Sequence, residues 1–235
     1  MNINDELRPK SSKKGIQYKE KNVMTGGKKW LILVFLLAIV HYSFGEIIYK
    51  TDSRFSHLTV KDGLPHNNVL CIYQDSHGFM WFGTENGLSR YDGYSVSNFS
   101  QRAFDSTTLP GNIVSCLLED DRRQLWIGTN GGIGIYQRAS ETFQHITLGE
   151  EGSAPNYVLG LAELGKDTFY ILSTQHLYRY TWKDKKMQVV PFSEPDMITH
   201  ISTLHRYQSK LWLGGQTGIF VYDKEKHALV RPLAD

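Results

Sequence analysis

The stretch from Asp75 to Gly93, DSHGFMWFGTENGLSRYDG, decides the fold. Two strand-like runs, FMWFG and LSRY, alternate with polar turn residues, and the pairs Asn86-Gly87 and Asp92-Gly93 stand where the chain must reverse. Asn-Gly and Asp-Gly between such runs are strong hairpin signals, because both turn positions must tolerate positive φ. Together with an inner strand over residues 68–74 and an outer strand over residues 94–99, the stretch predicts four short antiparallel strands.

The same pattern recurs along the chain with a period near 45 residues. Three columns of residues keep register from one copy to the next. The columns are Pro65, Pro110, Pro155 and Pro195; Trp81, Trp126, Ile171 and Trp212; and Tyr91, Tyr136, Tyr180 and Tyr222. Four strands in 40–45 residues are typical of a propeller blade. Because such a blade leaves both faces of its sheet apolar, the Trp and Tyr columns are predicted to form the core between neighbouring blades.

The predicted fold class is therefore all-β: a β-propeller of four-stranded antiparallel blades, preceded by an N-terminal hydrophobic helix. We expect a partial propeller over residues 55–235, with blades at about 64–100, 109–147, 154–192 and 196–233. Four blades are the lower limit of the usual four to eight. The sequence is therefore expected to stop partway round a larger propeller, as a fragment or a truncated product.

The first fifty residues resemble a targeting segment more than a folded domain. Residues 1–23 are interpreted as a polar tail or as the result of a mis-assigned start, and residues 46–54 as a linker. Residues 24–45 contain Lys28-Lys29 followed by the apolar run Trp30 to Val40. This run fits a signal peptide and is shorter than the ~20 residues that span a bilayer, although an uncleaved membrane anchor stays open. The positive flank predicts that the rest is exported to the periplasm, cleaved or tethered to the inner membrane.

Composition excludes several classes of function. The formal net charge is only +2 in 235 residues, and much of the positive charge precedes Trp30, so no nucleic-acid surface is expected. The two cysteines, Cys71 and Cys116, are 45 residues apart and are interpreted as small core residues of neighbouring blades. The nine His residues show no metal-ligand spacing, so we expect neither a metal site nor a cofactor.

Residues 55–69 (FSHLTVKDGLPHNNV) and 74–93 (QDSHGFMWFGTENGLSRYDG) closely resemble the two-component-regulator propeller repeat. The second repeat is similar, whereas the resemblance fades in the third, where Ile171 and Ser173-Thr174 replace Trp and Gly-Thr. Such repeats are found in the periplasmic sensor regions of hybrid two-component histidine kinases. The resemblance implies an extracytoplasmic sensing fragment that recognises an oligosaccharide and signals through a homodimer in the full-length sensor. No kinase or DNA-binding part is recognised in the chain, and the membrane is expected to be contacted only through the N-terminal segment.

Ligands of propellers usually meet the face formed by the loops that precede the inner strands and by the turns between the second and third strands. These loops hold amides and carboxylates, which suit sugar hydroxyls because they donate and accept hydrogen bonds. The candidate binding residues are His66, Asn67, Glu85, Asn86, Asn112, Asn130, Asn156 and Gln216. Turn formation is the competing interpretation for each. Tyr157 and Arg102 are further candidates for stacking or clamping a ligand.

Two alternatives to sensing remain open at this point. One is a secreted propeller that serves as a scaffold for protein–protein interaction. The other is a propeller glycosidase or lyase, for which Asp75, Asp120 and the run Glu119–Asp121 would supply paired carboxylates. We expect no catalytic residues, because these acids lie in predicted turns, where they are common as turn formers.

Overall fold

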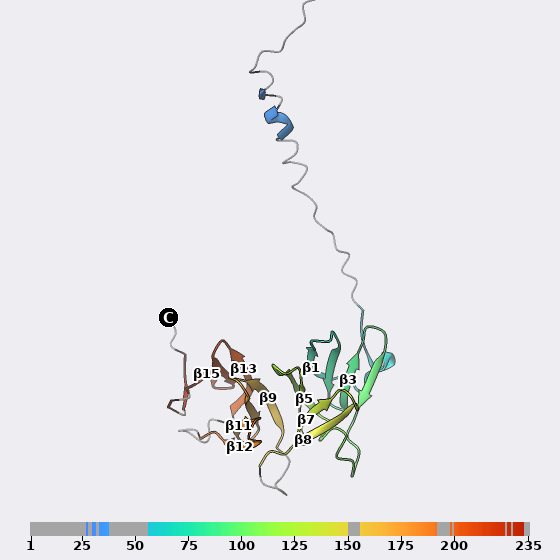
Figure 1. Cartoon of the computed structure of the whole chain (residues 1–235), viewed down its shortest axis with the longest axis vertical. Helices are drawn as coiled ribbons and strands as arrows, with labels where there is room; N and C mark the ends of the chain where they lie inside the picture. The colour runs from blue at the N-terminus through green and yellow to red at the C-terminus, as the bar shows by residue number, and fades with distance from the viewer. Residues whose placement is uncertain are drawn as a thin grey trace, which may run out of the picture. The chain divides into compact units, whose positions relative to one another are not determined.

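The computed structural model describes residues 27, 30, 31, 33–37, 56–149, 156–191, 198, 200–223, 225, 226 and 228–232. The chain divides into two units, Met1–Phe55 and Ser56–Asp235. In the first unit, residues 27, 30, 31 and 33–37 are helical (Figure 1). No helix formed by the described residues has the length and apolar character needed to cross a bilayer. The expected tail at 1–23, the linker at 46–54 and most of the segment 24–45 lie outside the described residues.

The second unit begins with a short 3₁₀ turn, Val60–Asp62, and continues as four antiparallel sheets. The first sheet contains β1 (Val69–Gln74), β2 (Met80–Thr84), β3 (Gly87–Tyr91) and β4 (Val96–Phe99), and the second contains β5 (Val114–Glu119), β6 (Leu125–Thr129), β7 (Gly132–Gln137) and β8 (Thr142–Ile146). The third contains β9 (Val158–Glu163), β10 (Thr168–Ser173), β11 (Leu177–Thr181) and β12 (Lys186–Val189), and the fourth contains β13 (Ile201–Tyr207), β14 (Lys210–Gly215), β15 (Gly218–Asp223) and β16 (Ala228–Val230). Each sheet pairs its strands in chain order, so the predicted all-β class of four-stranded antiparallel blades is confirmed.

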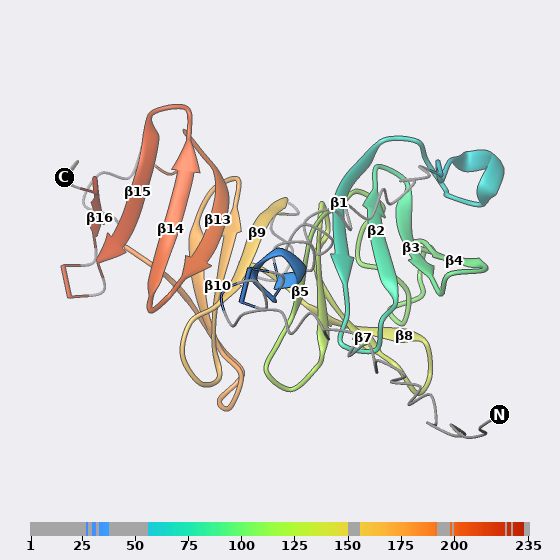
Figure 2. The same ribbon diagram turned by 90° about the horizontal axis from the view of Figure 1, so that it is seen from above.

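The four sheets follow one another side by side in sequence order (Figure 2). Their innermost strands are neighbours, since β1 contacts β5, β5 contacts β9, and β9 contacts β13. Three clusters of buried apolar side chains lie between consecutive sheets, one at each junction. The core is therefore not inside any sheet but between sheets, as in the blades of a propeller.

Aromatic side chains fill each junction. Trp81 of the first sheet has its ring 5.0 Å from the ring of Tyr136 in the second, edge to face. Trp126 of the second sheet stacks on Phe169 of the third at 4.1 Å and meets Tyr180 at 6.0 Å. Both Trp side chains are fully buried. Aromatic pairs of this geometry contribute about 0.5–1.5 kcal/mol each beyond the area that they bury.

The structure corrects one residue of the Trp column. Ile171 points back toward the second sheet and packs in the same cluster as Trp126. The residue of the third sheet that faces the fourth is Tyr170, whose ring lies 5.8 Å from that of Tyr222. The third repeat is one residue shorter before this position, and in a strand a shift of one residue moves a side chain to the other face.

Two glycines of the inner hairpins mark close approaches between sheets. A Cβ on Gly83 would lie 2.8 Å from the carbonyl oxygen of Val114 in the second sheet and would collide with Cys71 Sγ. A Cβ on Gly128 would lie 2.7 Å from Val158 Cγ1 of the third sheet. The Gly of each Gly-Thr pair is therefore required by the neighbouring sheet, because a methyl group has no room there.

We predict that Gly83→Ala destabilises the second unit by about 1–3 kcal/mol through overpacking. If there were room for the methyl group, the same substitution would stabilise the folded state, because the unfolded chain has fewer conformations with alanine than with glycine. Chemical unfolding followed by circular dichroism measures the change. The double variant Cys71→Ala/Gly83→Ala should recover part of the loss, and a Gly83→Ala protein more stable than the wild type would contradict the close approach.

Candidate ligand-binding end of the sheets

Each sheet has two ends with different chemistry. We call the end that carries the connection between the first and second strands the Asp end, after Asp75 and Asp120. The opposite end carries the turn between the second and third strands, and we call it the Thr end, after Thr84 and Thr129. The candidate binding residues lie at the Thr end, whereas the acidic residues considered for catalysis lie at the Asp end.

At the Asp end, Asp75 holds its own turn together. Its carboxylate accepts hydrogen bonds from the backbone N–H groups of His77 (2.9 Å) and Phe79 (3.0 Å), and from Trp81 Nε1 at 2.8 Å. Arg138 of the second sheet adds a charged contact at 2.9 Å. Burial alone would raise the pKa of Asp75, but the hydrogen bonds from Trp81 and Arg138 outweigh it and leave the pKa below its usual value. Asp75 is thus an ionised structural group.

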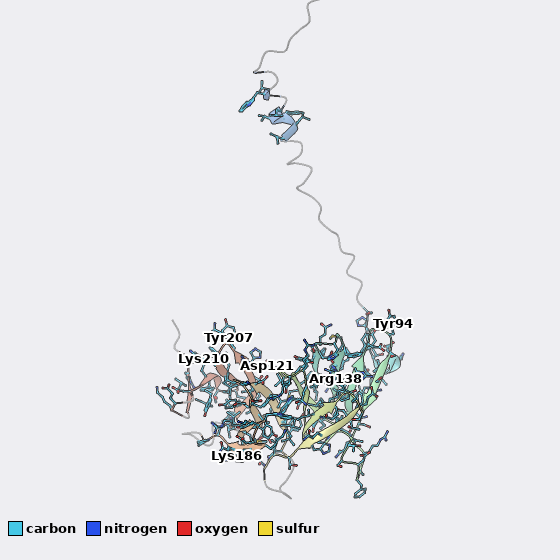
Figure 3. All side chains as sticks on the ribbon, viewed as in Figure 1. Tyr94, Asp121, Arg138, Lys186, Tyr207 and Lys210 are labelled. Atoms are coloured by element: carbon cyan, nitrogen blue, oxygen red, sulfur yellow. The ribbon has the colours of Figure 1, made fainter. Side chains whose placement is uncertain are left out.

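The second sheet repeats this turn, and hydrogen bonds and ion pairs at the turn join the first sheet to the second. Asp120 accepts a hydrogen bond from Trp126 Nε1 at 3.1 Å, together with two backbone N–H groups. Glu119 accepts hydrogen bonds from Ser76 N (2.7 Å) and Oγ (2.9 Å), and Arg138 contacts it at 3.1 Å (Arg138 is labelled in Figure 3). These carboxylates are occupied by structural contacts, so they do not form an open pair facing a substrate.

At the junction between the second and third sheets, Glu163 corresponds to Glu119 of the preceding junction. Its carboxylate accepts a hydrogen bond from Asp121 N at 3.0 Å. Here burial dominates and raises the pKa of Glu163, because the hydrogen bond from Asp121 N and the charge of Arg122 offset it only in part. The pKa values of Asp75 and Glu163 are therefore shifted in opposite directions.

At the Thr end, a hydroxyl closes the turn of each of the first three sheets. Thr84 Oγ1 donates to the carbonyl of Gly87 at 2.9 Å and accepts from Asn86 N at 3.1 Å. Thr129 and Ser173 make the corresponding contacts in the second and third sheets. The backbone of the turn is thereby satisfied, and the Asn86 side chain is left exposed with no hydrogen bond to the described residues.

Four of the candidate amides hold loops in place. The contacts are Val60 N to Asn67 Oδ1 (3.1 Å), Gln101 N to Asn112 Oδ1 (2.7 Å), Ile113 N to Asn130 Oδ1 (3.1 Å), and Asn156 Nδ2 to Leu148 O (3.3 Å) and to the Tyr178 hydroxyl (3.2 Å). Asn156 is buried, and its Oδ1 has no partner among the described residues. The turn chemistry that competed with binding is present at all four positions.

The remaining candidates of the first sheet form a polar cluster. Glu85 Oε1 accepts a hydrogen bond from Asn68 Nδ2 at 2.6 Å, and His66 Nδ1 lies 3.8 Å from Glu85 Oε2. The side chains of His66 and Glu85 are 44% and 46% exposed. Tyr157 directly precedes β9, and burial raises the pKa of its hydroxyl, to which the charges of Cys116 and Glu85 add. We call His66, Asn68, Glu85 and Asn86 the Thr-end cluster.

Sequence reasoning missed Asn68, although it directly follows the candidates His66 and Asn67. Gln216 is exposed in the turn between β14 and β15, where its backbone N–H donates to His200 O at 3.0 Å. No contact joins Gln216 to the Thr-end cluster. Arg102 lines a separate cavity of about 220 Å³ near β4 and β8. The candidates therefore do not form one site.

The Thr-end cluster offers a carboxylate, an imidazole and two amides on an open surface. This set can donate and accept hydrogen bonds, which suits a neutral, hydroxyl-rich ligand. It contains no hydroxyl or thiol nucleophile beside a base. The described residues also contain no group of three or more His, Cys, Asp or Glu side chains that could hold a metal ion.

Two stretches of the chain, residues 63–86 and 108–131, match the family described as two component regulator propeller. The resemblance inferred for the first two repeats is therefore confirmed. The chain is also 31% identical over 77 residues to histidine kinase P4 of Formosa agariphila, an alignment that covers 32% of this chain and 6% of that protein.

Solved sensor structures share the fold. The extracellular domain of a putative hybrid two component system from B. thetaiotaomicron superposes with a TM-score of 0.65 at 19% identity, covering 76% of this chain and 26% of that one. The extracellular domain of a putative one component system from the same organism gives 0.63 at 21% identity, covering 80% and 24%. The chain thus spans about a quarter of these solved chains, and it is a propeller domain that resembles extracellular sensor domains of two-component systems.

An enzyme has the same fold at lower similarity. Virginiamycin B lyase from Staphylococcus aureus gives a TM-score of 0.53 at 15% identity, covering 69% of this chain and 54% of that one. The likeness concerns the fold alone, because propellers with the same blades host unrelated functions.

We predict that Asp75→Asn lowers the free energy of unfolding by about 1–3 kcal/mol at neutral pH, since it weakens charged hydrogen bonds to Trp81 and Arg138. The folded-state pKa of Asp75 is depressed, so its contribution is complete above the ordinary value of 3.8 and is lost as the pH falls through the folded-state value. The difference between variant and wild type should therefore shrink in acid. Urea unfolding at a series of pH values measures it.

We predict the opposite pH dependence of stability for Glu163→Gln. Its folded-state pKa is raised, so the ionised form carries a penalty above that pKa, and the penalty disappears as the pH falls. The glutamine can still accept the hydrogen bond from Asp121 N. We expect the variant to be at least as stable as the wild type at neutral pH and to lose that advantage in acid. A parallel response of the two variants would contradict this assignment.

Proposed function

We propose that this chain is the ligand-sensing propeller segment of a hybrid two-component sensor histidine kinase. The observation that carries the proposal is the pair of adjoining repeats, 63–86 and 108–131, that match the two component regulator propeller within a run of four consecutive sheets. The kinase and DNA-binding parts belong to the full-length sensor, and this segment contributes recognition of the signal.

The segment acts outside the cytoplasm, in the periplasm. The charged and apolar N-terminal sequence supports export by a signal peptide or tethering to the inner membrane. The membrane is contacted only through that segment. Signal passes to the cytoplasm through a homodimer of the full-length sensor.

The ligand is a glycan, bound at the Thr end. The support is chemical: the exposed Asn86 side chain has no hydrogen bond to the described residues, and the exposed Glu85 carboxylate, which accepts one hydrogen bond from Asn68 Nδ2, can accept others from the hydroxyls of a sugar. His66 Nδ1 lies 3.8 Å from Glu85 Oε2. Four other candidate amides are occupied by loop contacts, which supports the choice of the Thr-end cluster as the proposed recognition surface.

We expect one member of an oligosaccharide panel to raise the melting temperature of the full chain. At a ligand concentration one hundred times Kd, binding adds about 2.7 kcal/mol, which corresponds to roughly 5–10 °C for a domain of this size. Differential scanning fluorimetry with the panel measures the shift. The double variant Glu85→Ala/Asn86→Ala should lose most of it.

The matched control is Lys183→Ala/Asp184→Ala, which truncates two exposed side chains in the turn between β11 and β12. This control should keep the full shift. If both double variants respond alike, the glycan does not bind at the Thr end. If no saccharide changes the melting temperature, the scaffold for protein–protein interaction becomes the better assignment.

A lyase or glycosidase is the second candidate, and the fold shared with virginiamycin B lyase is the observation that favours it. Against it, the acidic residues of the Asp end are occupied by Trp, Arg and backbone donors. Products formed from the same oligosaccharides during the binding assay would support the enzyme.

A further inference from the structure

The first two sheets each have a backbone N–H group just before the innermost strand that needs an acceptor, and they satisfy it with different residues. In the first sheet, Asn68 N donates to His66 Nδ1 at 3.1 Å. In the second, Ile113 N donates to Asn130 Oδ1 at 3.1 Å. The two donors correspond, because Glu85 N donates back to Asn68 O in the first sheet. In the same way, Asn130 N donates back to Ile113 O in the second.

The two ways of capping this N–H group exclude each other. Gly111 occupies in the second sheet the place that His66 has in the first, 45 residues earlier. A Cβ on Gly111 would collide with Asn130 Oδ1, so no histidine fits there while Asn130 provides the cap. In the first sheet, His66 provides the cap, and Glu85 stands at the place of Asn130. The Glu85 carboxylate is therefore free of this structural role.

The cap also fixes the tautomer of the His66 ring. A backbone N–H group can only donate, so His66 Nδ1 must accept and carries no proton. In the neutral ring the proton is then on Nε2, because the hydrogen bond made by one ring nitrogen determines the state of the other. Nε2 makes no hydrogen bond to the residues that the structure describes, and the side chain is 44% exposed. His66 therefore presents an N–H donor to the solvent.

Glu85 places an acceptor beside this donor. Its Oε1 atom accepts a hydrogen bond from Asn68 Nδ2 at 2.6 Å, so Asn68 orients both the imidazole and the carboxylate. The Oε2 atom of Glu85 lies 3.8 Å from His66 Nδ1, and this side chain is 46% exposed. Because Nδ1 carries no proton, it does not donate to Oε2. An open donor and an open acceptor thus lie next to each other on one surface.

We propose that His66 and Glu85 determine the ligand specificity of the Thr-end cluster and select a neutral sugar through two neighbouring hydroxyl groups. This inference rests on the proposed function and adds the chemical class of the glycan. One hydroxyl accepts the hydrogen bond from His66 Nε2, and the next donates its proton to Glu85 Oε2. Asn86 follows Glu85 in the same turn, and its exposed amide is available to a further hydroxyl.

The same pair of residues disfavours anionic sugars. A carboxylate or sulfate group has acceptor atoms only, so it gives no hydrogen bond to Glu85. An anionic group and Glu85 also repel each other. Among the described residues, the ion-pair contact of Glu85 is with His66, which is neutral in this tautomer. A uronic acid therefore binds more weakly than the neutral sugar that has the same arrangement of hydroxyl groups.

The first measurement tests the tautomer and needs no ligand. Two-bond ¹H–¹⁵N correlation spectra of the full chain, recorded above the ordinary titration range of histidine, show which ring nitrogen carries the proton. The variant His66→Gln assigns the His66 signals by their loss. We expect the proton on Nε2. A proton on Nδ1, or an equal mixture of the two tautomers, overturns the proposal.

The second measurement compares sugars by NMR titration of the Asn86 side-chain amide signals. The probes are glucose, galactose and mannose, each tested beside its uronate. We expect at least one neutral sugar to bind, and its uronate to bind about three- to fivefold more weakly because of one like charge at the surface. In Glu85→Gln this difference should disappear, since the repulsion is removed.

Two substitutions of His66 separate the outward donor from the backbone cap. An asparagine can accept from Asn68 N with its amide oxygen but does not reach the position of Nε2, whereas a glutamine reaches that position and retains an N–H donor. His66→Asn should therefore weaken binding of the neutral sugar about fivefold, which corresponds to one neutral hydrogen bond, and His66→Gln should stay within about twofold of the wild type.

The outcomes distinguish this proposal from the proposed function. If a sugar and its uronate bind with equal affinity, or if His66→Asn binds as tightly as the wild type, the specificity assigned to His66 and Glu85 is wrong and glycan sensing stands. If neither these sugars nor the oligosaccharide panel bind, both proposals fail, whichever tautomer is found.

Discussion

Successive sheets are held together by a Trp or Tyr ring on one sheet and a Tyr ring on the next, and the rest of the structure depends on this contact. A four-stranded sheet of this size has two apolar faces and no core of its own, so its stability comes from packing against a neighbouring sheet. The contact fixes how the sheets stand side by side. It therefore also fixes which strand ends gather at the Asp end and which at the Thr end.

Much of the fold could be predicted from the sequence, because glycine and aromatic residues recur for reasons that act locally. The Asn86-Gly87 turn predicts the hairpin of β2 and β3. The Gly83-Thr84 pair marks the position where the second sheet approaches this hairpin closely. The misplacement of Ile171 shows the limit: the loss of one residue exchanges the two faces of the strand, and the aligned Trp column alone does not show that loss. The Tyr column does register it, since Tyr136 and Tyr180 are 44 residues apart whereas Trp126 and Ile171 are 45 apart. The contact between Tyr170 and Tyr222 in the structure confirms the shift.

The candidate site was harder to anticipate than the fold. Asparagine at a loop can bind a ligand or cap its own backbone, and the residue type is the same in both cases. Asn112 and Asn130 accept backbone N–H groups seventeen residues or fewer away, contacts that depend on the folded loop. Asn68 was overlooked because its role arises from Glu85, which lies in a different turn. Whether a side chain is already occupied separates the amides that hold loops from Asn86, whose side chain has no hydrogen bond to the described residues.

The two glycines that allow the sheets to approach also enclose the thiols of Cys71 and Cys116, which are free. Burial raises the pKa of both thiols to about 12. At neutral pH the thiolate fraction is then on the order of 10⁻⁵, and the thiolate is the form that attacks disulfides and oxidants. Both thiols should therefore react slowly with disulfides and oxidants even in an oxidising compartment. The protein can then keep two unpaired cysteines without forming disulfides between chains.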